Sequence, residues 1–181
     1  SIGLAKAFPE KNFIGIDIKG ARLWRGAKSA VEEQMHNVAF VRTRIEFIES
    51  LFGPGEISEI WITFADPQIK RDNKRLTNSR FIERYNSFLI DGGIIHLKTD
   101  SRFLHEYTVA MATYNGYKIL EEIKDIYGSG RADRLLSIKT HYEKQYLAQG
   151  IPITYLSFIP DKEKKPGEPE WDPGIYIVTP R

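Results

Sequence analysis

The stretch from Trp61 to Arg75 reads WITFADPQIKRDNKR and gives the strongest indication of the fold. Its first residues form an apolar run typical of a buried β-strand, and Asp66-Pro67 ends that run. Four cations then follow within six residues, with Asp72 the opposing charge among them. This order places a carboxylate beside a basic cluster of the kind that suits a polyanion.

Apolar, β-branched runs alternate with segments of helical period along most of the chain. Such alternation is typical of an α/β fold in which a parallel sheet is covered by helices. We expect four strand-and-helix units, with Gly92-Gly93 ending the third helix. The predicted strands cover 12–18, 38–42, 59–64 and 94–98, and the predicted helices cover 21–31, 45–52, 81–89 and 103–114.

The rhythm changes after Gly116. We expect a strand within 117–127, a helix over 141–148 and a strand over 153–159, with the last strands pairing antiparallel at the sheet edge. Residues 161–174 are rich in Lys, Glu, Pro and Gly, a composition that predicts a flexible segment. The expected organisation is one domain over 1–160 and a tail over 161–181, in which 175–178 is a candidate strand for docking back onto the sheet.

Composition excludes several classes of protein. The 181 residues include 41% hydrophobic ones, enough for a substantial core, and 26 basic residues nearly balance 24 acidic ones. Attraction to phosphate must therefore come from local clustering of charge. The chain has no cysteine, which excludes thiolate nucleophiles, disulfides and Cys-ligated metals. Because no apolar run approaches the ~20 residues of a membrane span, we expect a cytoplasmic protein without a membrane segment.

Acidic residues end three of the four predicted strands, at Asp17, Asp66 and Asp100. Ligands of open α/β sheets bind beyond the carboxyl ends of the strands. Asp17 could accept hydrogen bonds from both hydroxyls of a ribose, or it could cap the helix that follows. Asp66 could serve a ligand, or its side chain could open a turn before Pro67. The basic cluster could be a solvated face, but its attachment to the ligand edge favours nucleic-acid binding.

Two further features have both a structural and a functional interpretation. Asp100 could cap the helix that follows it, and Thr140 stands three residues before Glu143, which is the capping-box spacing. A carboxylate at either place could instead accept from the N1–H and N2 amino group of an extruded guanine. Both interpretations stay open at this point.

Other catalytic classes lack their motifs. The four histidines, at positions 36, 96, 105 and 141, show no metal-ligand spacing, and we expect no metal site. The chain contains no Gly-x-Ser-x-Gly elbow and no Gly-x-x-x-x-Gly-Lys phosphate loop. Hydrolase and NTPase activities are therefore not favoured.

Four segments, in this order, together resemble the bacterial tRNA (guanine-N7)-methyltransferase family. They are FIGID at 13–17, WITFADPQ at 61–68 with its basic run, HLKTD at 96–100 and THYE at 140–143. The resemblance extends over roughly residues 1–158. It implies a Rossmann-like, class I methyltransferase fold, mostly parallel with an antiparallel C-terminal edge strand. It further implies S-adenosyl-L-methionine as the cofactor and tRNA as the partner.

The resemblance also assigns roles to individual residues. It makes Asp17 the ribose-binding acid, puts Arg44 and Ile45 beside the adenine, and makes Asp66 the catalytic residue at the junction of cofactor and substrate. The implied substrate-binding positions are Lys70, Asp100, Thr140, His141, Tyr142 and Glu143. The implied tRNA-backbone contacts are Arg71, Lys74 and Arg75.

The sequence departs from the family pattern in several places. The family's first strand and its Glu-x-Gly-x-Gly cofactor loop would lie just before Ser1. Arg44 stands where the family commonly has Asp or Asn, with Glu46 close enough in sequence to compensate. Ala65 replaces the proline usual before Asp66-Pro67. Residues beyond Phe158 have no counterpart in the resemblance.

Chemistry refines the role expected of Asp66. Guanine N7 carries a lone pair and no proton, so its methylation needs no general base. We therefore expect Asp66 to position the base and stabilise the positive charge that develops on it. Two alternatives remain: a methyltransferase with a non-tRNA acceptor, and a Rossmann-like module that binds nucleotide or RNA without catalysis, favoured by the missing glycine loop.

Overall fold

The computed structural model describes residues 1–172, apart from the side chain of His141. The described chain forms two compact units. The first comprises Ser1–Leu51 and Asp133–Ile138, and the second comprises Phe52–Ala132 and the described residues from Lys139 onward.

The first unit is a parallel strand pair with helices. Its elements are α1 (Ile2–Ala7), β1 (Phe13–Asp17), α2 (Gly20–Glu32), β2 (Val38–Arg42) and the 3₁₀ helix η1 (Ile45–Ser50). The register of the strands runs from Phe13 opposite Val38 to Asp17 opposite Arg42, and α2 packs on both strands. Gly15 and Gly26 are needed there, because a Cβ on either would meet the Phe40 ring at 2.8 or 2.6 Å.

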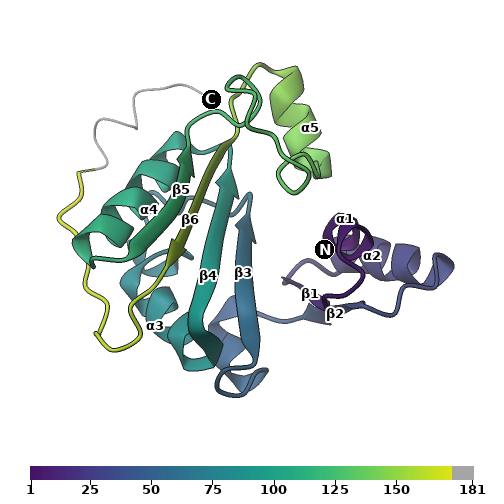
Figure 1. Ribbon diagram of the computed structural model, residues 1–181, viewed down its shortest axis with the longest axis horizontal. Helices are drawn as coiled ribbons and strands as arrows, with labels where there is room; N and C mark the ends of the chain where they lie inside the picture. The colour runs from purple at the N-terminus through teal and green to yellow at the C-terminus, as the bar shows by residue number, and fades with distance from the viewer. Residues whose placement is uncertain (173–181) are drawn as a thin grey trace. The chain divides into compact units, whose positions relative to one another are not determined.

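The second unit carries a four-stranded sheet in the order β3-β4-β6-β5 (Figure 1). Its elements are β3 (Ile57–Thr63), the 3₁₀ helix η2 (Asp72–Lys74), α3 (Ser79–Phe88), β4 (Leu89–Thr99), α4 (Arg102–Tyr114), β5 (Lys118–Ile123), α5 (His141–Ala148) and β6 (Thr154–Ile159). Strands β3 and β4 are parallel, and β6 is antiparallel to both β4 and β5. The α/β class and the antiparallel C-terminal strand are confirmed, and that strand lies between β4 and β5.

The core of the second unit lies where α3 and α4 pack on the sheet. Ile82 of α3, Leu97 of β4 and Leu156 of β6 have no exposed surface, and Leu104 of α4 is 1% exposed. Burying an aliphatic side chain of this size contributes about 1.5–3 kcal/mol. This packing therefore fixes the strands whose carboxyl ends carry the residues of interest.

The predicted role of Gly92-Gly93 is wrong. Helix α3 already ends at Phe88, and β4 begins at the next residue, Leu89. The glycines lie where the β3–β4 register shifts, between the pair Ile57–Leu89 and the pair Glu59–Ile94. Gly92 has a φ of +73°, a left-handed conformation that suits such an irregularity in a strand.

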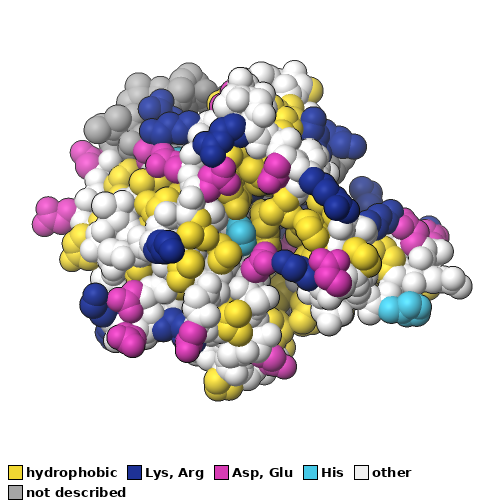
Figure 2. Space-filling model, viewed as in Figure 1, with side chains coloured by type: hydrophobic (Ala, Val, Ile, Leu, Met, Phe, Trp, Pro, Cys, Tyr) yellow, Lys and Arg dark blue, Asp and Glu magenta, His cyan; other side chains and the backbone are white. Residues whose placement is uncertain are grey.

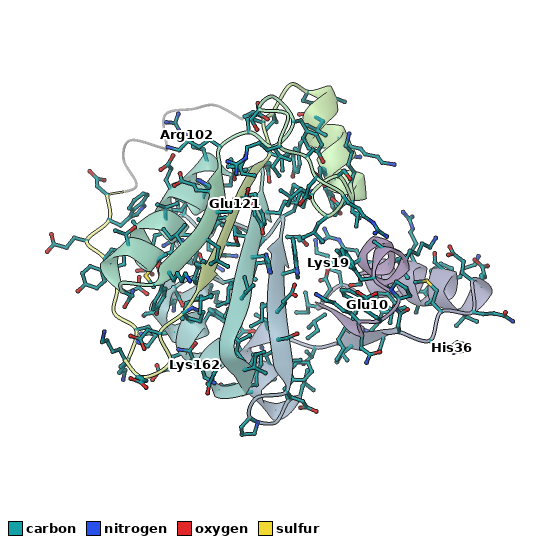
Figure 3. The ribbon with its side chains drawn as sticks, viewed as in Figure 1. Glu10, Lys19, His36, Arg102, Glu121 and Lys162 are labelled. Atoms are coloured by element: carbon teal, nitrogen blue, oxygen red, sulfur yellow. The ribbon has the colours of Figure 1, made fainter. Side chains whose placement is uncertain are left out.

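The composition of residues 161–174 predicts a flexible segment, whereas residues 161–172 lie along α4 (Figure 1). Lys162, labelled in Figure 3, donates to the carbonyl of Leu89 at 2.6 Å. Asn115 donates to the carbonyl of Gly167 at 2.9 Å and accepts from its N–H at 2.8 Å. These bonds offset the cost of ordering a polar segment. The candidate strand at 175–178 lies outside the described residues.

The visible surface mixes charges of both signs. Figure 2 shows Lys and Arg side chains interspersed with Asp and Glu, in keeping with a net charge of +2. Within residues 1–172, no helix is both long enough and apolar enough to cross a membrane.

Candidate active site at the carboxyl ends of β3 and β4

The loop after β3 holds Asp66 in a tight turn. The Asp66 side chain is exposed, and its Oδ1 accepts from the Gln68 N–H at 2.9 Å. The turn predicted as the structural alternative is therefore confirmed, but it uses only one carboxylate oxygen. Two non-glycine residues with positive φ flank this turn, Phe64 at +51° and Gln68 at +49°. Such backbone strain persists only where the surroundings hold it, and it is often found at functional sites.

Asp66 opens onto a surface hollow. Residues 66–71 line a shallow, open depression of about 390 Å³. Lys70 and Arg71 belong to its wall, and Lys74 follows in η2. All three side chains are exposed, and none forms an ion pair with another described residue. The charges of these three cations therefore face solvent.

Arg75 behaves differently from the other cations of the run. It is only 3% exposed, its Nε donates to the Pro67 carbonyl at 3.1 Å, and its Nη2 donates to the Gln68 carbonyl at 3.2 Å. The guanidinium of Arg75 thus faces the inside of the Asp66 loop, whereas the sequence predicts a contact of Arg75 with the tRNA backbone.

Asp100 follows the neighbouring strand. Thr63 pairs with Lys98 in the parallel register, so β3 and β4 end at the same edge of the sheet. The Phe64 N–H donates to the Lys98 carbonyl at 2.9 Å just beyond that pair. Helix α4 is capped by Ser101, whose hydroxyl accepts from the Leu104 N–H at 3.2 Å. The prediction that Asp100 caps α4 is therefore wrong, and the Asp100 side chain is half-buried.

The start of α5 forms the capping box that the sequence predicts. Thr140 Oγ1 accepts from the Glu143 N–H at 3.1 Å, and Glu143 Oε2 accepts from the Thr140 N–H at 3.1 Å. Glu143 Oε1 also accepts from Lys98 Nζ at 2.7 Å and from the Tyr127 hydroxyl at 2.6 Å. Burial, and then the bond to this carboxylate, raises the pKa of Tyr127.

The substrate contact predicted for Glu143 stays a prediction, and this geometry gives the residue an internal role. Glu143 is 0% exposed, and its carboxylate is shared among the helix cap, Lys98 and Tyr127. These contacts hold α5 to the end of the sheet. Tyr142, by contrast, is 37% exposed.

Helix α5 lies beyond the ends of β3 and β4 (Figure 1). The Tyr146 ring of α5 stacks on Phe64, with ring centroids 6.0 Å apart and planes 23° apart. Together with the Lys98–Glu143 pair, this contact ties α5 to the end of the sheet that carries Asp66 and Asp100. Three of the four segments singled out in the sequence thus meet at one edge.

The fourth segment belongs to the first unit. Asp17 ends β1, and its carboxylate accepts from the Lys19 N–H at 2.9 Å and lies 3.5 Å from Arg22 Nη1. The N-cap of α2 is Lys19, so Asp17 forms the turn before the helix and is not its cap. Arg44 is the N-cap of η1, which begins at Ile45. Its side chain is exposed and pairs with Glu46 at 3.4 Å.

Sequence reasoning missed two residues of this arrangement, Lys98 and Tyr127. A lysine within the apolar strand 94–98 was the available signal, because a buried ammonium requires a partner. Its partner lies 45 positions away (143 − 98 = 45), which no local pattern identifies. Among the described residues, no group of three His, Asp or Glu side chains gathers in a way that could hold a metal ion.

Known proteins resemble this chain over most of its length. A family model described as "Putative methyltransferase" matches residues 1–156. A tRNA (guanine-N(7)-)-methyltransferase of Porphyromonas gingivalis is 51% identical over 180 residues, which cover 97% of this chain and 74% of the relative. A protein of the same name from Christiangramia forsetii is 54% identical over 161 residues, covering 87% of this chain and 72% of the relative.

Solved structures share the fold at low sequence identity. The 16S rRNA methyltransferase KamB has a TM-score of 0.63 at 11% identity and covers 87% of this chain and 81% of its own. A 30S ribosomal A1408 methyltransferase from an uncultured bacterium has a TM-score of 0.60 at 16% identity, covering 87% and 80%. The class I methyltransferase fold is thereby confirmed. Together with the family model and the curated relatives, this establishes that the chain belongs to the tRNA (guanine-N(7)-)-methyltransferase family.

Proposed function

We propose that this chain transfers a methyl group from S-adenosyl-L-methionine to N7 of a guanine in tRNA. The observation that carries the proposal is the exposed Asp66 carboxylate, held in a strained turn at a strand end and followed at once by exposed cations. Relatives at 51% and 54% identity carry the name of this activity. A tRNA substrate also makes the cytoplasm the expected place of action.

The Asp17 carboxylate suits the ribose of the cofactor. Its Oδ1 accepts from the Lys19 N–H at 2.9 Å and its Oδ2 from Arg22 Nη1 at 3.5 Å, while its side chain stays 28% exposed. Because an ionised carboxylate has about four acceptor sites, capacity remains for ribose hydroxyls. Arg44 and Ile45 stay the proposed neighbours of the adenine. When bound, the cofactor supplies an electrophilic methyl group on a sulfonium.

Asp66 acts on the guanine by charge and by position. As the bond from N7 to the methyl carbon forms and the bond from that carbon to sulfur breaks, the purine ring gains positive charge. A carboxylate oxygen held beside the ring stabilises that charge more in the transition state than in the ground state. Since the Gln68 N–H occupies Oδ1, we assign this role to Oδ2.

The remaining site residues divide between base and backbone. Asp100, Thr140 and Tyr142 are proposed substrate contacts at the edge that Asp66 occupies, and position 141 stays a prediction. Lys70 is proposed to contact the substrate, and Arg71 and Lys74 to bind backbone phosphates. The exposure of all three cations supports contacts with tRNA, because phosphate contacts require cations that reach solvent.

The test is to incubate the full-length native protein with S-adenosyl-L-methionine and an unmodified tRNA transcript, and then to identify nucleosides by mass spectrometry. We expect 7-methylguanosine. Asp66→Asn keeps an oxygen for the turn and removes the charge, so kcat should fall about 100- to 1,000-fold with little change in tRNA affinity.

Glu10→Gln is the matched control, since the Glu10 side chain is exposed and precedes β1, away from the carboxyl ends of the strands. It should leave turnover unchanged. Methylation of a different nucleoside would contradict the proposed acceptor, and full activity of Asp66→Asn would remove Asp66 from its role.

A further inference from the structure

We propose that Arg75 is a positioning residue for Asp66, and that the segment 161–172 closes the aromatic cradle in which Arg75 is held. The inference rests on the proposed function, because it concerns the loop that presents Asp66. It gives the last cation of the basic run a structural task distinct from that of Lys70, Arg71 and Lys74, and it makes the C-terminal segment part of the site.

The guanidinium of Arg75 holds two successive carbonyls directly after Asp66. Nε donates to Pro67 at 3.1 Å and Nη2 donates to Gln68 at 3.2 Å. Gln68 has a left-handed backbone conformation, and its N–H donates to the Asp66 carboxylate. Its carbonyl accepts from Arg75, so Gln68 links the arginine directly to the acid. Both donors belong to the planar fork of one guanidinium, a geometry that the ammonium of a lysine does not reproduce.

Two aromatic rings of α4 form the cradle for Arg75. The guanidinium carbon lies 4.0 Å from the centre of the Tyr107 ring and 4.9 Å from that of Phe103. Both rings are nearly fully buried, Tyr107 at 1% and Phe103 at 4% exposure. Cation–π contact in such a desolvated place is substantial, and it restricts the rotamers open to the arginine.

The segment 161–172 also contacts both of these rings. Glu168 accepts from the Tyr107 hydroxyl at 2.6 Å and from the Ser79 N–H at 2.7 Å. The Trp171 ring meets the Phe103 and Tyr107 rings edge to face, with centroids 6.3 and 5.9 Å apart. Glu168 and Trp171 therefore contact the two rings, and the rings contact Arg75. Arg75 in turn bonds to the loop that holds Asp66.

A phosphate role for Arg75 would conflict with these contacts. Reaching solvent from 3% exposure would require the guanidinium to leave both rings and both carbonyls. Lys74, its neighbour in the sequence, is exposed and needs no such change. The two adjacent residues thus form a matched pair in which one faces the loop and the other faces solvent.

The experiment compares Arg75→Lys with Lys74→Gln in the full-length protein. Arg75→Lys keeps the positive charge and loses the planar fork. We expect its kcat to fall about 10- to 100-fold, as for a misplacement of roughly 1 Å, with unchanged tRNA affinity and unchanged dependence of binding on salt. Lys74→Gln should reduce the slope of log affinity against log salt by about 0.9, a change that Arg75→Lys should not show.

A second readout does not depend on activity. Amide hydrogen exchange of residues 66–70, measured by mass spectrometry without cofactor or tRNA, should be faster in Arg75→Lys than in wild type and unchanged in Lys74→Gln. If the wild type made no 7-methylguanosine, the proposed function would fail, whereas this exchange measurement would still judge the anchoring of the loop.

Two variants of the cradle keep the proposal testable if Arg75→Lys does not fold. Tyr107→Phe keeps the ring under Arg75 and removes its bond to Glu168, and Trp171→Ala removes the edge contacts. Each should speed exchange at 66–70 and lower kcat, by less than Arg75→Lys does. Slow exchange in all three variants, or a reduced salt slope in Arg75→Lys, would overturn the proposal.

Discussion

Exposed and buried cations around the Asp66 loop differ in what they can bind. Lys70, Arg71 and Lys74 are exposed, and no described carboxylate pairs with them. Arg75 and Lys98 are 3% and 4% exposed, and each bonds to oxygen atoms of the protein. The first set has its charge available for a polyanion, whereas the second set uses its charge to hold the parts of the site. Residue type and spacing alone do not separate the two sets.

The difference follows from the cost of desolvation. A charge taken out of water is tolerated only if it is paired and hydrogen-bonded, so a buried cation must serve a particular internal partner. An exposed cation keeps its hydration and gains little from pairing within the protein. Removing members of the two sets should therefore affect different quantities, stability for the buried ones and salt-dependent binding for the exposed ones.

The largest effect is expected from Lys98→Met. The substitution fills a similar volume and leaves the Glu143 carboxylate, 0% exposed, without its cation. Removing one partner of a buried ion pair destabilises by about 3–5 kcal/mol. Urea denaturation followed by circular dichroism measures the change in the free energy of unfolding.

Lys124→Met provides the control for this prediction. Lys124 is 71% exposed and pairs with Glu106 and Glu122 at 3.8 and 3.7 Å, so its loss should cost no more than about 1 kcal/mol. Adding Glu143→Met to Lys98→Met should restore part of the stability, because no unpaired charge is then left inside. Equal losses for Lys98→Met and Lys124→Met would end the distinction drawn between the two sets.

The next effect concerns the exposed set, tested by the triple variant Lys70→Gln, Arg71→Gln and Lys74→Gln. If each cation neutralises one phosphate, the slope of log affinity against log salt should fall by about 2.7, and affinity at low salt roughly 10- to 100-fold. Fluorescence anisotropy with labelled tRNA between 50 and 200 mM salt is the measurement.

A triple variant of exposed cations on and after β5, at Lys118, Lys124 and Arg131, controls for net charge. It should change the slope much less than the first triple variant. The free energy of unfolding should stay within about 0.5 kcal/mol in the first triple, as for surface substitutions generally. In the control triple, Lys124 and Arg131 each lose partly exposed carboxylate partners, and each loss should cost no more than about 1 kcal/mol. Equal slopes in the two triples would show that the run 70–74 has no particular role in binding.

A smaller effect is expected from Tyr127→Phe, which removes the 2.6 Å bond to Glu143 and leaves Lys98 in place. The loss of a hydrogen bond to a charged group should cost about 1.5 kcal/mol or somewhat more. Tyr142→Phe, which changes an exposed neighbour in α5, should cost nothing measurable.

This tyrosine also predicts an alkaline effect. The folded pKa of Tyr127 lies above its ordinary value of 10.0, through burial and then the bond to Glu143. Its contribution is therefore fully present below pH 10 and is lost as pH rises toward the folded pKa. Wild type should lose more stability than Tyr127→Phe above pH 10, and parallel curves would contradict the assignment.

Much of the fold was predictable because its signals are local. The strand over 38–42 and the helix over 141–148 have the predicted bounds, since β-branched periodicity and a capping box mark them directly. Gly92-Gly93 was misjudged because glycines serve strand irregularities as well as helix ends. The contacts of residues 161–172 with α4 could not be predicted, because composition does not reveal them and α4 ends more than 40 positions earlier (161 − 114 = 47).

The site was predictable in its positions more than in its roles. Acids at strand ends identified Asp66 and Asp100, because the parallel register brings those ends together. The separate tasks of Lys74 and Arg75 could not be told apart, since adjacent cations in a loop have no periodicity to indicate which one turns inward. For Glu143, the capping-box spacing could be recognised in the sequence, but the ion pair with the distant Lys98 could not.

The smallest predicted effect tests the buried imidazole of His105 in α4. It is 1% exposed, with Glu122 at 3.5 Å and with Glu106 and Lys124 near it. Burial lowers the pKa of His105 from its ordinary value of 6.5, although Glu122 opposes that shift. The unfolded chain therefore binds a proton more readily than the folded one, and stability should fall as pH drops below 6.5.

In His105→Gln the curve of unfolding free energy between pH 5 and 7.5 should be flatter, whereas His36→Gln, at an exposed position labelled in Figure 3, should follow wild type. If the His105→Gln curve were as steep as that of wild type, the wild-type His105 ring would take up its proton inside the fold. His105 would then be a third buried cation, in addition to Arg75 and Lys98.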